Sequence, residues 1–134
     1  MESGRTVRGW YSDRERPPVP CIRLKVYTPS ERYLAEIDAN VDTGFSGSLL
    51  ISPDLYIKLG LALYEEPEVV RGSVAGGYFI DLRVSNGIVE LNGLRTACKI
   101  YTALLAKKNL VGRALLNRFR LVLDGKSGVV EVEL

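Results

Sequence analysis

The chain has 134 residues, which fits a single folded domain with one modest hydrophobic core. Hydrophobic residues make up 46% and charged residues 25%, as in globular domains, and a net charge of +2 with interspersed acids and bases predicts no nucleic-acid partner. No histidine is present, which excludes imidazole as a general base or zinc ligand, so any acid–base chemistry must come from Asp, Glu, Lys, Tyr or a bound cofactor.

The N-terminal segment differs in pattern from the rest of the chain. Residues 1–20 contain three prolines and mixed charges without an apolar period, so we expect an extended or mobile arm there and one β-domain over 21–134. The segment lacks the apolar core of a secretion signal, and apolar runs elsewhere are only a few residues long. We therefore expect no membrane partner and a cytoplasmic location. Cys21 and Cys98 are expected to be small buried hydrophobic residues.

Two strands follow the arm. Apolar and polar residues alternate from 21 to 27, which predicts a half-buried strand that ends at a turn over 28–30. A second strand is predicted over 33–41, returning beside the first and ending at Asp42-Thr43-Gly44.

The only well-marked helix comes after a short apolar strand over 48–51. Ser52 is suited to cap the helix, Pro53 fits its first turn, and Gly60 can end it in the left-handed conformation. The predicted helix is therefore only about two turns long.

Strands and tight turns make up most of the remainder. Predicted strands over 69–74 and 78–84 flank Ala75-Gly76-Gly77, and the pairs Asn86-Gly87 and Asn92-Gly93 each predict a hairpin turn. This part of the chain is therefore expected to be a meander of antiparallel strands.

The C-terminal part begins with another short apolar run. Leu110-Val111-Gly112 is expected to lead into a helical turn that ends at Asn117, and a closing hairpin is predicted over 119–134. Many short strands with one or two short helices predict an all-β fold, a small closed or partly closed β-barrel.

One carboxylate is placed where a predicted strand ends. Asp42 precedes Thr43 and Gly44, and apolar residues frame the segment, so this carboxylate is expected at the edge of the core. Asp-Thr-Gly is also an ordinary turn sequence. The small residues Ser46 and Gly47 then lead into the apolar strand and the capped helix.

This segment resembles the active-site segment of the retropepsin-like aspartic proteases. Leu110-Val111-Gly112-Arg113 is similar to the family's second signature, in which two apolar residues and a glycine pack behind the catalytic loop before a short helix. Gly76-Gly77 is similar to the tip of the flap that folds over a bound peptide. Ser46 and Ala114 stand where viral members carry an acidic residue and an acidic or amide residue, so the partner of Arg113 stays open.

The resemblance implies an aspartic endopeptidase with a barrel of the retropepsin type. Such enzymes use two carboxylates that share a proton: one accepts a proton from water while the other donates one to the peptide carbonyl. This chain has a single Asp-Thr-Gly, so two copies of Asp42 would meet on the two-fold axis of a homodimer. In the family the threonine, here Thr43, bridges the subunits beneath the carboxylates. Gly44, Ser46 and the flap glycines Gly76 and Gly77 would contact a peptide or protein substrate, with no metal or organic cofactor.

Two other interpretations fit the same residues. A non-catalytic dimeric β-barrel that binds extended peptides under a flap would keep the fold without needing a carboxylate pair. A structural β-domain whose turn happens to spell the motif would need neither the pair nor the dimer.

Two groups near the predicted flap have structural interpretations. Glu65, Glu66 and Glu68 are expected to form a solvated approach to the flap strand, with a metal-binding carboxylate cluster as the alternative. Tyr78 and Phe79 are expected to be packing residues.

Overall fold

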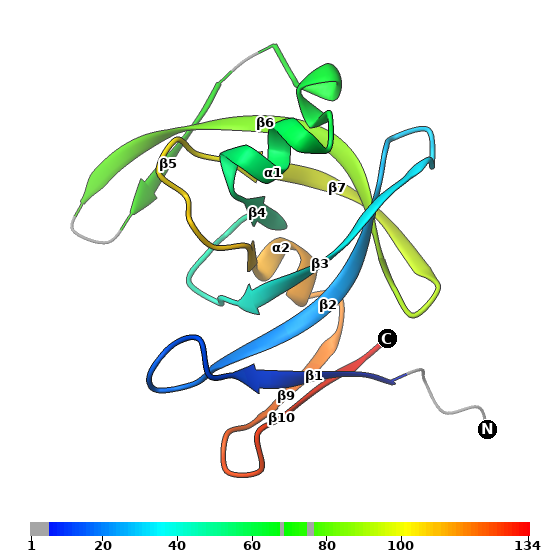
Figure 1. Ribbon diagram of the computed structural model, residues 1–134, viewed down its shortest axis with the longest axis vertical. Coiled ribbons are helices and arrows are strands. Elements are labelled where there is room, and N and C mark those ends of the chain that lie inside the picture. Colours follow the sequence, from blue (N-terminus) through cyan, green and yellow to red (C-terminus); the bar gives the residue numbers. More distant parts are fainter. Residues whose placement is uncertain (1–5, 68, 75–76) are drawn as a thin grey trace.

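The computed structural model describes residues 6–67, 69–74 and 77–134 (Figure 1). In chain order the elements are β1 (Thr6–Ser12), β2 (Val19–Tyr27), β3 (Tyr33–Val41), β4 (Leu49–Ile51), α1 (Pro53–Lys58), the 3-10 helix η1 (Leu61–Tyr64), β5 (Val70–Val74), β6 (Tyr78–Leu91), β7 (Leu94–Thr102), β8 (Leu110–Val111), α2 (Arg113–Leu116), β9 (Arg120–Asp124) and β10 (Val129–Glu133). The predicted all-β fold with short helices is confirmed.

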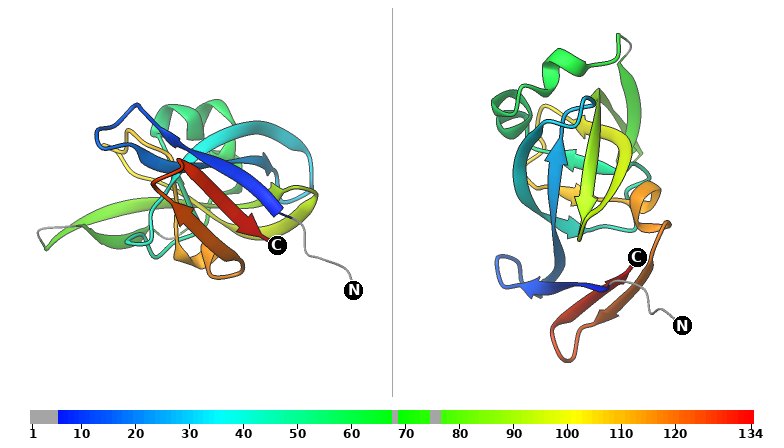
Figure 2. Two further views of the ribbon diagram at one scale, coloured as in Figure 1. Left: turned by 90° about the horizontal axis from the view of Figure 1, so that it is seen from below. Right: turned by 90° about the vertical axis from the view of Figure 1, so that its right-hand side faces the viewer.

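The strands form one partly closed sheet in the order β5-β6-β7-β4-β8-β3-β2-β1-β10-β9. The end of β6 also pairs with β2, where Val26 lies opposite Val89, so the strands from β6 through β2 close into a ring. The hairpin of β5 and β6 extends from one side of this barrel, and β1, β9 and β10 lie together at its lower end (Figures 1 and 2).

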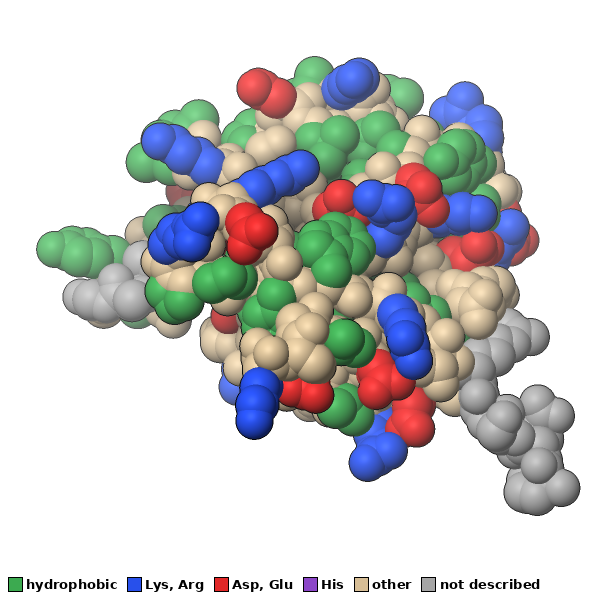
Figure 3. Space-filling view, turned by 60° about the horizontal axis from the view of Figure 1, so that its bottom comes forward, with side chains coloured by type: hydrophobic (Ala, Val, Ile, Leu, Met, Phe, Trp, Pro, Cys, Tyr) green, Lys and Arg blue, Asp and Glu red, His purple; other side chains and the backbone are tan. Residues whose placement is uncertain are grey.

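Apolar side chains of the ring strands fill the barrel. Buried and exposed positions alternate from Ile22 to Val26 in β2, and buried and half-buried positions alternate from Ile37 to Val41 in β3, so one face of each strand packs inside the barrel. The largest fully buried side chains in the described part of the chain are Tyr56, Ile22, Leu24, Leu49, Ile51, Leu61, Ile100, Leu115, Val26, Val89, Val111 and Val130. On the face shown in Figure 3, acidic and basic side chains are intermixed, in keeping with the dispersed charges of the sequence.

Helix α1 forms as its sequence predicts. The Ser52 hydroxyl accepts a hydrogen bond from the Leu55 N–H at 3.4 Å, Pro53 occupies the first turn, and Gly60 follows the helix with φ 73°. Tyr56 points inward and is fully buried, which fixes α1 against the barrel. No helix within the described residues is long and apolar enough to cross a membrane.

The structure differs from prediction at one of the two Asn-Gly pairs. Asn92-Gly93 forms the expected hairpin between β6 and β7, with Leu91 opposite Leu94 and φ of 47° and 83° at the two turn residues. Asn86-Gly87 lies inside β6, where it pairs with β7 and makes no turn. A Cβ on Gly87 would come within 2.4 Å of the Ile100 Cδ1 atom, so glycine serves close packing between the strands here.

The predicted antiparallel meander is found in β5, β6 and β7, but two other strand pairs are parallel. Strand β8 pairs in parallel with β3, and β4 pairs in parallel with β7, which brings segments far apart in the chain side by side. The predicted N-terminal arm also differs: from Thr6 onward it belongs to the sheet, because β1 pairs with both β10 and β2. Tyr11 of this strand packs against the core.

Candidate active site

The loop that carries Asp42 begins where β3 ends. The Asp42 N–H donates to the Val111 carbonyl of β8 at 2.9 Å, which continues the parallel pairing of the two strands by one residue. The Asp42 carbonyl then accepts from the Phe45 N–H at 3.2 Å, and the carboxylate oxygen Oδ1 accepts from the Gly44 N–H at 2.9 Å. The carboxylate is thus oriented by its own turn, as in an Asx turn.

The segment from β8 into α2 holds the far side of this loop. The Gly112 N–H donates to Ser48 O at 2.9 Å and the Arg113 N–H to Phe45 O at 2.9 Å. The backbones approach so closely that a Cβ on Gly112 would lie 2.3 Å from Gly47 O and 2.5 Å from Phe45 O. Glycine is therefore required at position 112 because only its backbone fits against the loop.

An aromatic pair supports the same loop from another side. The rings of Phe45 and Tyr101 are 5.8 Å apart at an interplanar angle of 86°, an edge-to-face arrangement. Gly47 lies against both, since a Cβ there would be 2.5 Å from Phe45 Cζ and 2.8 Å from Tyr101 Cε1. Burial raises the pKa of the Tyr101 hydroxyl. Neither aromatic residue stands out in the sequence, since each looks like an ordinary core side chain.

The Asp42 loop packs against buried residues on its core side and is exposed to solvent on its other side. Val111 is fully buried beneath it, Asp42 is half-buried, and Thr43, Gly44 and Ser46 are exposed. Within the described residues no basic side chain forms an ion pair with Asp42. A carboxylate in this setting can accept a proton or a hydrogen bond from a molecule in front of it, but one carboxylate alone cannot act as acid and base at the same moment.

The predicted flap is a hairpin on the same side of the molecule as the end of β3 (Figures 1 and 2). Gly77, with φ 80°, follows its tip, whereas Gly76 lies outside the described residues. Tyr78 and Phe79 are 71% and 68% exposed, so the expectation that they are packing residues is wrong for this single chain.

The predicted second signature is found against the Asp42 loop, with Leu110 and Val111 in β8, then Gly112 and Arg113. The Arg113 side chain is exposed and forms no ion pair with another described residue. Its backbone N–H, by contrast, contributes directly to holding the loop.

Glu65 and Glu66, the described glutamates before the flap, do not form a shared site. Glu65 pairs with Arg83 at 2.7 Å and Glu66 pairs with Lys99, while Glu68 lies outside the described residues. Among described residues, no group of three or more carboxylates or cysteines is placed to hold a metal ion.

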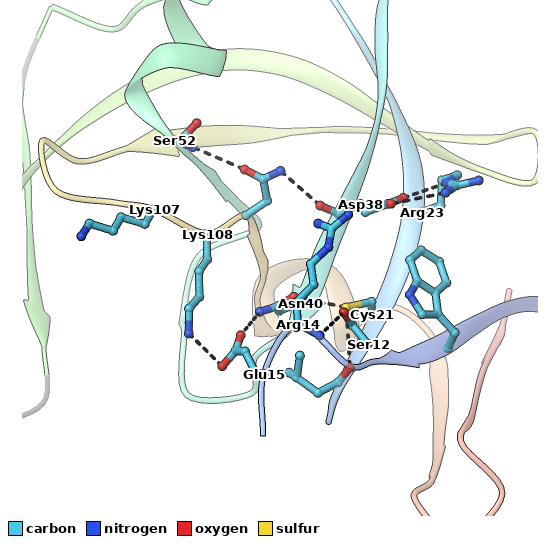
Figure 4. A pocket seen from close by; sticks show the side chains of 13 residues that line it. Ser12, Arg14, Glu15, Cys21, Arg23, Asp38, Asn40, Ser52, Lys107 and Lys108 are labelled. Carbon is cyan, nitrogen blue, oxygen red and sulfur yellow. Dashed lines mark hydrogen bonds and ion pairs between the residues drawn. The ribbon is translucent and has the colours of Figure 1, made fainter. Parts of the chain in front are cut away.

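A polar cleft of about 570 Å³ lies beside β3 and was not foreseen from the sequence (Figure 4). Asp38 and Asn40 line it from one face of β3, and Asp42 follows Asn40 by two residues, just past the end of the strand. Cys21 is buried at its base, with Sγ 3.2 Å from Asn40 Oδ1. Burial raises the pKa of the Cys21 thiol, so it is protonated at neutral pH.

Comparison with known proteins supports the fold. No protein-family model and no curated protein matches the sequence. The structure is similar to the crystal structure of a retropepsin-like aspartic protease from Rickettsia conorii, with 19% sequence identity, a TM-score of 0.58, and coverage of 98% of this chain and 96% of that chain. It is also similar to EIAV protease complexed with the inhibitor HBY-793, with 18% sequence identity, a TM-score of 0.55, and coverage of 84% of this chain and 98% of that chain. The chain therefore has the retropepsin-like fold.

Proposed function

We propose that this protein is an aspartic endopeptidase whose catalytic pair consists of Asp42 from each of two identical chains. The observation that carries the proposal is the Asp42 loop itself. It places a half-buried carboxylate at the open end of β3, oriented by the Gly44 N–H and held from behind by the β8–α2 segment, within a retropepsin-like fold.

The chemistry requires a second carboxyl group. When two carboxylates approach within a few ångströms, like charges prevent both from ionising, so the pair holds one proton between them. The ionised member takes a proton from water as the water attacks the peptide carbonyl, and the protonated member donates to the carbonyl oxygen. No covalent enzyme intermediate forms on this route.

A homodimer is the simplest arrangement that supplies the second carboxyl group. The chain contains one Asp-Thr-Gly, and a two-fold axis beside Asp42 would place two exposed Thr43 residues and two Asp42 carboxylates around it. Exposed Gly44 and Ser46 would then border the substrate backbone, and the β5–β6 hairpin with Gly76 and Gly77 would cover it. Exposure of Tyr78 and Phe79 fits a hairpin that gains its contacts from a substrate or a partner chain.

The first test is cleavage of a denatured protein mixture by wild type and by Asp42→Asn. Cleavage should be lost in the variant while folding is retained, and wild-type activity should decline as the pH rises and the shared proton is lost. Asp54→Asn is the matched control, because Asp54 is an exposed aspartate in the first turn of α1. Equal peptide binding by wild type and Asp42→Asn with no cleavage by either would instead identify a peptide-binding module.

A mixing experiment tests whether both carboxylates are needed. Wild type and Asp42→Asn are unfolded together in equal amounts and refolded, so that subunits pair at random. If each active site needs two Asp42 residues, activity falls to about one quarter of that of an all-wild-type sample at the same total concentration. A value of about three quarters would mean that one Asp42 suffices for each dimer, and a value of about one half that each chain acts independently; either result would contradict the shared pair.

A further inference from the structure

The polar cleft beside β3 carries more positive charge than its own carboxylates neutralise. Its charged side chains are Arg14, Arg23, Lys107 and Lys108 against Glu15 and Asp38. Both acids are already paired: Arg23 Nε lies 2.7 Å from Asp38 Oδ1, and Lys108 Nζ lies 2.9 Å from Glu15 Oε1. Two basic side chains, Arg14 and Lys107, form no ion pair within the described part of the chain.

The floor of the cleft is a connected network that fixes its shape. Asn40 Nδ2 donates to Glu15 Oε2 at 3.0 Å, which ties the β1–β2 loop to β3. Asn109 bridges the opposite wall, donating to Asp38 O at 3.1 Å and accepting from the Ser52 N–H at 3.4 Å. The hydrogen bond from Lys108 lowers the pKa of Glu15, so this carboxylate stays ionised and paired under mildly acidic conditions.

The cleft lies close enough to Asp42 for one bound peptide to reach both. Asp42 follows Asn40 by two residues, just past the end of β3, and two residues of extended chain span roughly 7 Å. An extended peptide advances about 3.3 Å per residue, so a substrate passing Asp42 would bring a side chain to the cleft roughly two or three residues from the cut bond. In Figure 4, Arg14 extends through the middle of the cleft and Lys107 lies at its margin.

We propose that this cleft is a specificity subsite that receives an acidic side chain, aspartate or glutamate, of the peptide substrate. The proposal rests on the peptidase function proposed above. Arg14 would pair with the incoming carboxylate inside the cleft and Lys107 at its mouth. The Arg23–Asp38 and Lys108–Glu15 pairs would hold the walls. In a homodimer the cleft occurs twice, so the preference should appear at two positions, one on each side of the cut bond.

The test compares peptides that differ by a single charge. One cleaved, end-blocked peptide is resynthesised with Glu or Gln at each of the three positions on either side of the cut, and kcat/KM is measured for every pair. Because both ends are blocked, only the side chain supplies the carboxylate. At each of the two matching positions the Glu peptide should be cut about tenfold faster than the Gln peptide, and the ratio should shrink as NaCl rises from about 0.05 M to about 0.5 M.

Substitutions of the cleft's basic residues test whether the cleft causes the preference for Glu peptides. In the double variant Arg14→Gln/Lys107→Gln the Glu/Gln ratio should fall to near one, and Lys107→Glu should also lower the ratio, because it replaces one of the two unpaired positive charges with a negative one. Lys126→Glu is the matched control, since Lys126 is exposed in the β9–β10 turn and the substitution changes the net charge by two units, as the double variant and Lys107→Glu both do. A wild-type ratio near one at every position, or a ratio that survives the double substitution, overturns the subsite.

Binding separates failure of the subsite from failure of the proposed function. The same peptides are titrated into Asp42→Asn protein and followed by fluorescence anisotropy. Tighter binding of the Glu peptide that is lost on removing Arg14 and Lys107 supports the subsite even if wild type cleaves nothing, in which case only the peptidase activity is refuted. Equal binding of Glu and Gln peptides refutes the subsite whatever the cleavage assay shows.

Discussion

Gly112→Ala tests whether close backbone approach builds the Asp42 loop. The added Cβ would lie 2.3 Å from Gly47 O and 2.5 Å from Phe45 O, so both carbonyls must move away. Those two oxygens accept the hydrogen bonds from Ala114 N–H, at 3.2 Å, and Arg113 N–H, at 2.9 Å. Losing both costs about 2 kcal/mol and overpacking about 1–3 kcal/mol more, so the free energy of unfolding should fall by about 3–5 kcal/mol.

Urea denaturation followed by circular dichroism measures the loss, with Gly125→Ala as the matched control. A Cβ on Gly125 has no neighbour nearer than Tyr11 Oη at 3.7 Å, so the control should stay within about 0.5 kcal/mol of wild type. If the free energy of unfolding of Gly112→Ala is also within about 1 kcal/mol of the wild-type value, the loop accommodates the added methyl group and the packing argument is wrong.

Two further substitutions examine polar groups away from the loop. Thr102 is 2% exposed and its Oγ1 has no hydrogen-bond partner among the described residues, so Thr102→Val should raise the free energy of unfolding by about 1 kcal/mol; destabilisation would contradict the unpaired hydroxyl. The hydrogen bonds from Arg95 and then Tyr27 lower the pKa of Glu90 from its ordinary 4.5, so the carboxylate stabilises the fold above that pH and its contribution disappears as the pH falls through the lowered value. Glu90→Gln should therefore be less stable than wild type at neutral pH, and the gap should close in acid; a gap independent of pH would refute the linkage.

Local sequence patterns were sufficient for most elements. The bounds of β3 follow from alternation, α1 follows from Ser52, Pro53 and Gly60, and the closing hairpin pairs Leu121 with Val132 as expected. These features depend on neighbours in the chain, so their physical causes are visible in the sequence.

Pairings between distant segments could not be predicted in this way. Nothing in the residues around Leu110 indicates that β8 lies parallel to β3, and the Asn86-Gly87 turn signal is overridden by a ladder of nine residue pairs between β6 and β7. The N-terminal strand was missed because its proline-rich neighbourhood suggested an arm, whereas β10 provides a partner edge for it.

The residues of the candidate site also fall into two groups, those that the sequence indicates and those that only the fold reveals. Asp42 and Gly112 could be found because each lies in a short motif that resembles a retropepsin signature. The bracing pair of Phe45 and Tyr101 could not be found, since its meaning comes from a contact across more than fifty residues. Arg14 and Lys107 look like ordinary surface residues until the fold brings the β1–β2 loop beside the segment before β8.

The parallel pairing of β3 with β8 also governs when the site can form during synthesis. Asp42 leaves the ribosome long before Val111, Gly112 and Arg113, which supply or accept the hydrogen bonds that hold its loop. A nascent chain shorter than this therefore contains the carboxylate without the scaffold that orients it, and contacts so distant in sequence form late in folding. Translation itself thus delays formation of the Asp42 loop until most of the polypeptide has been made.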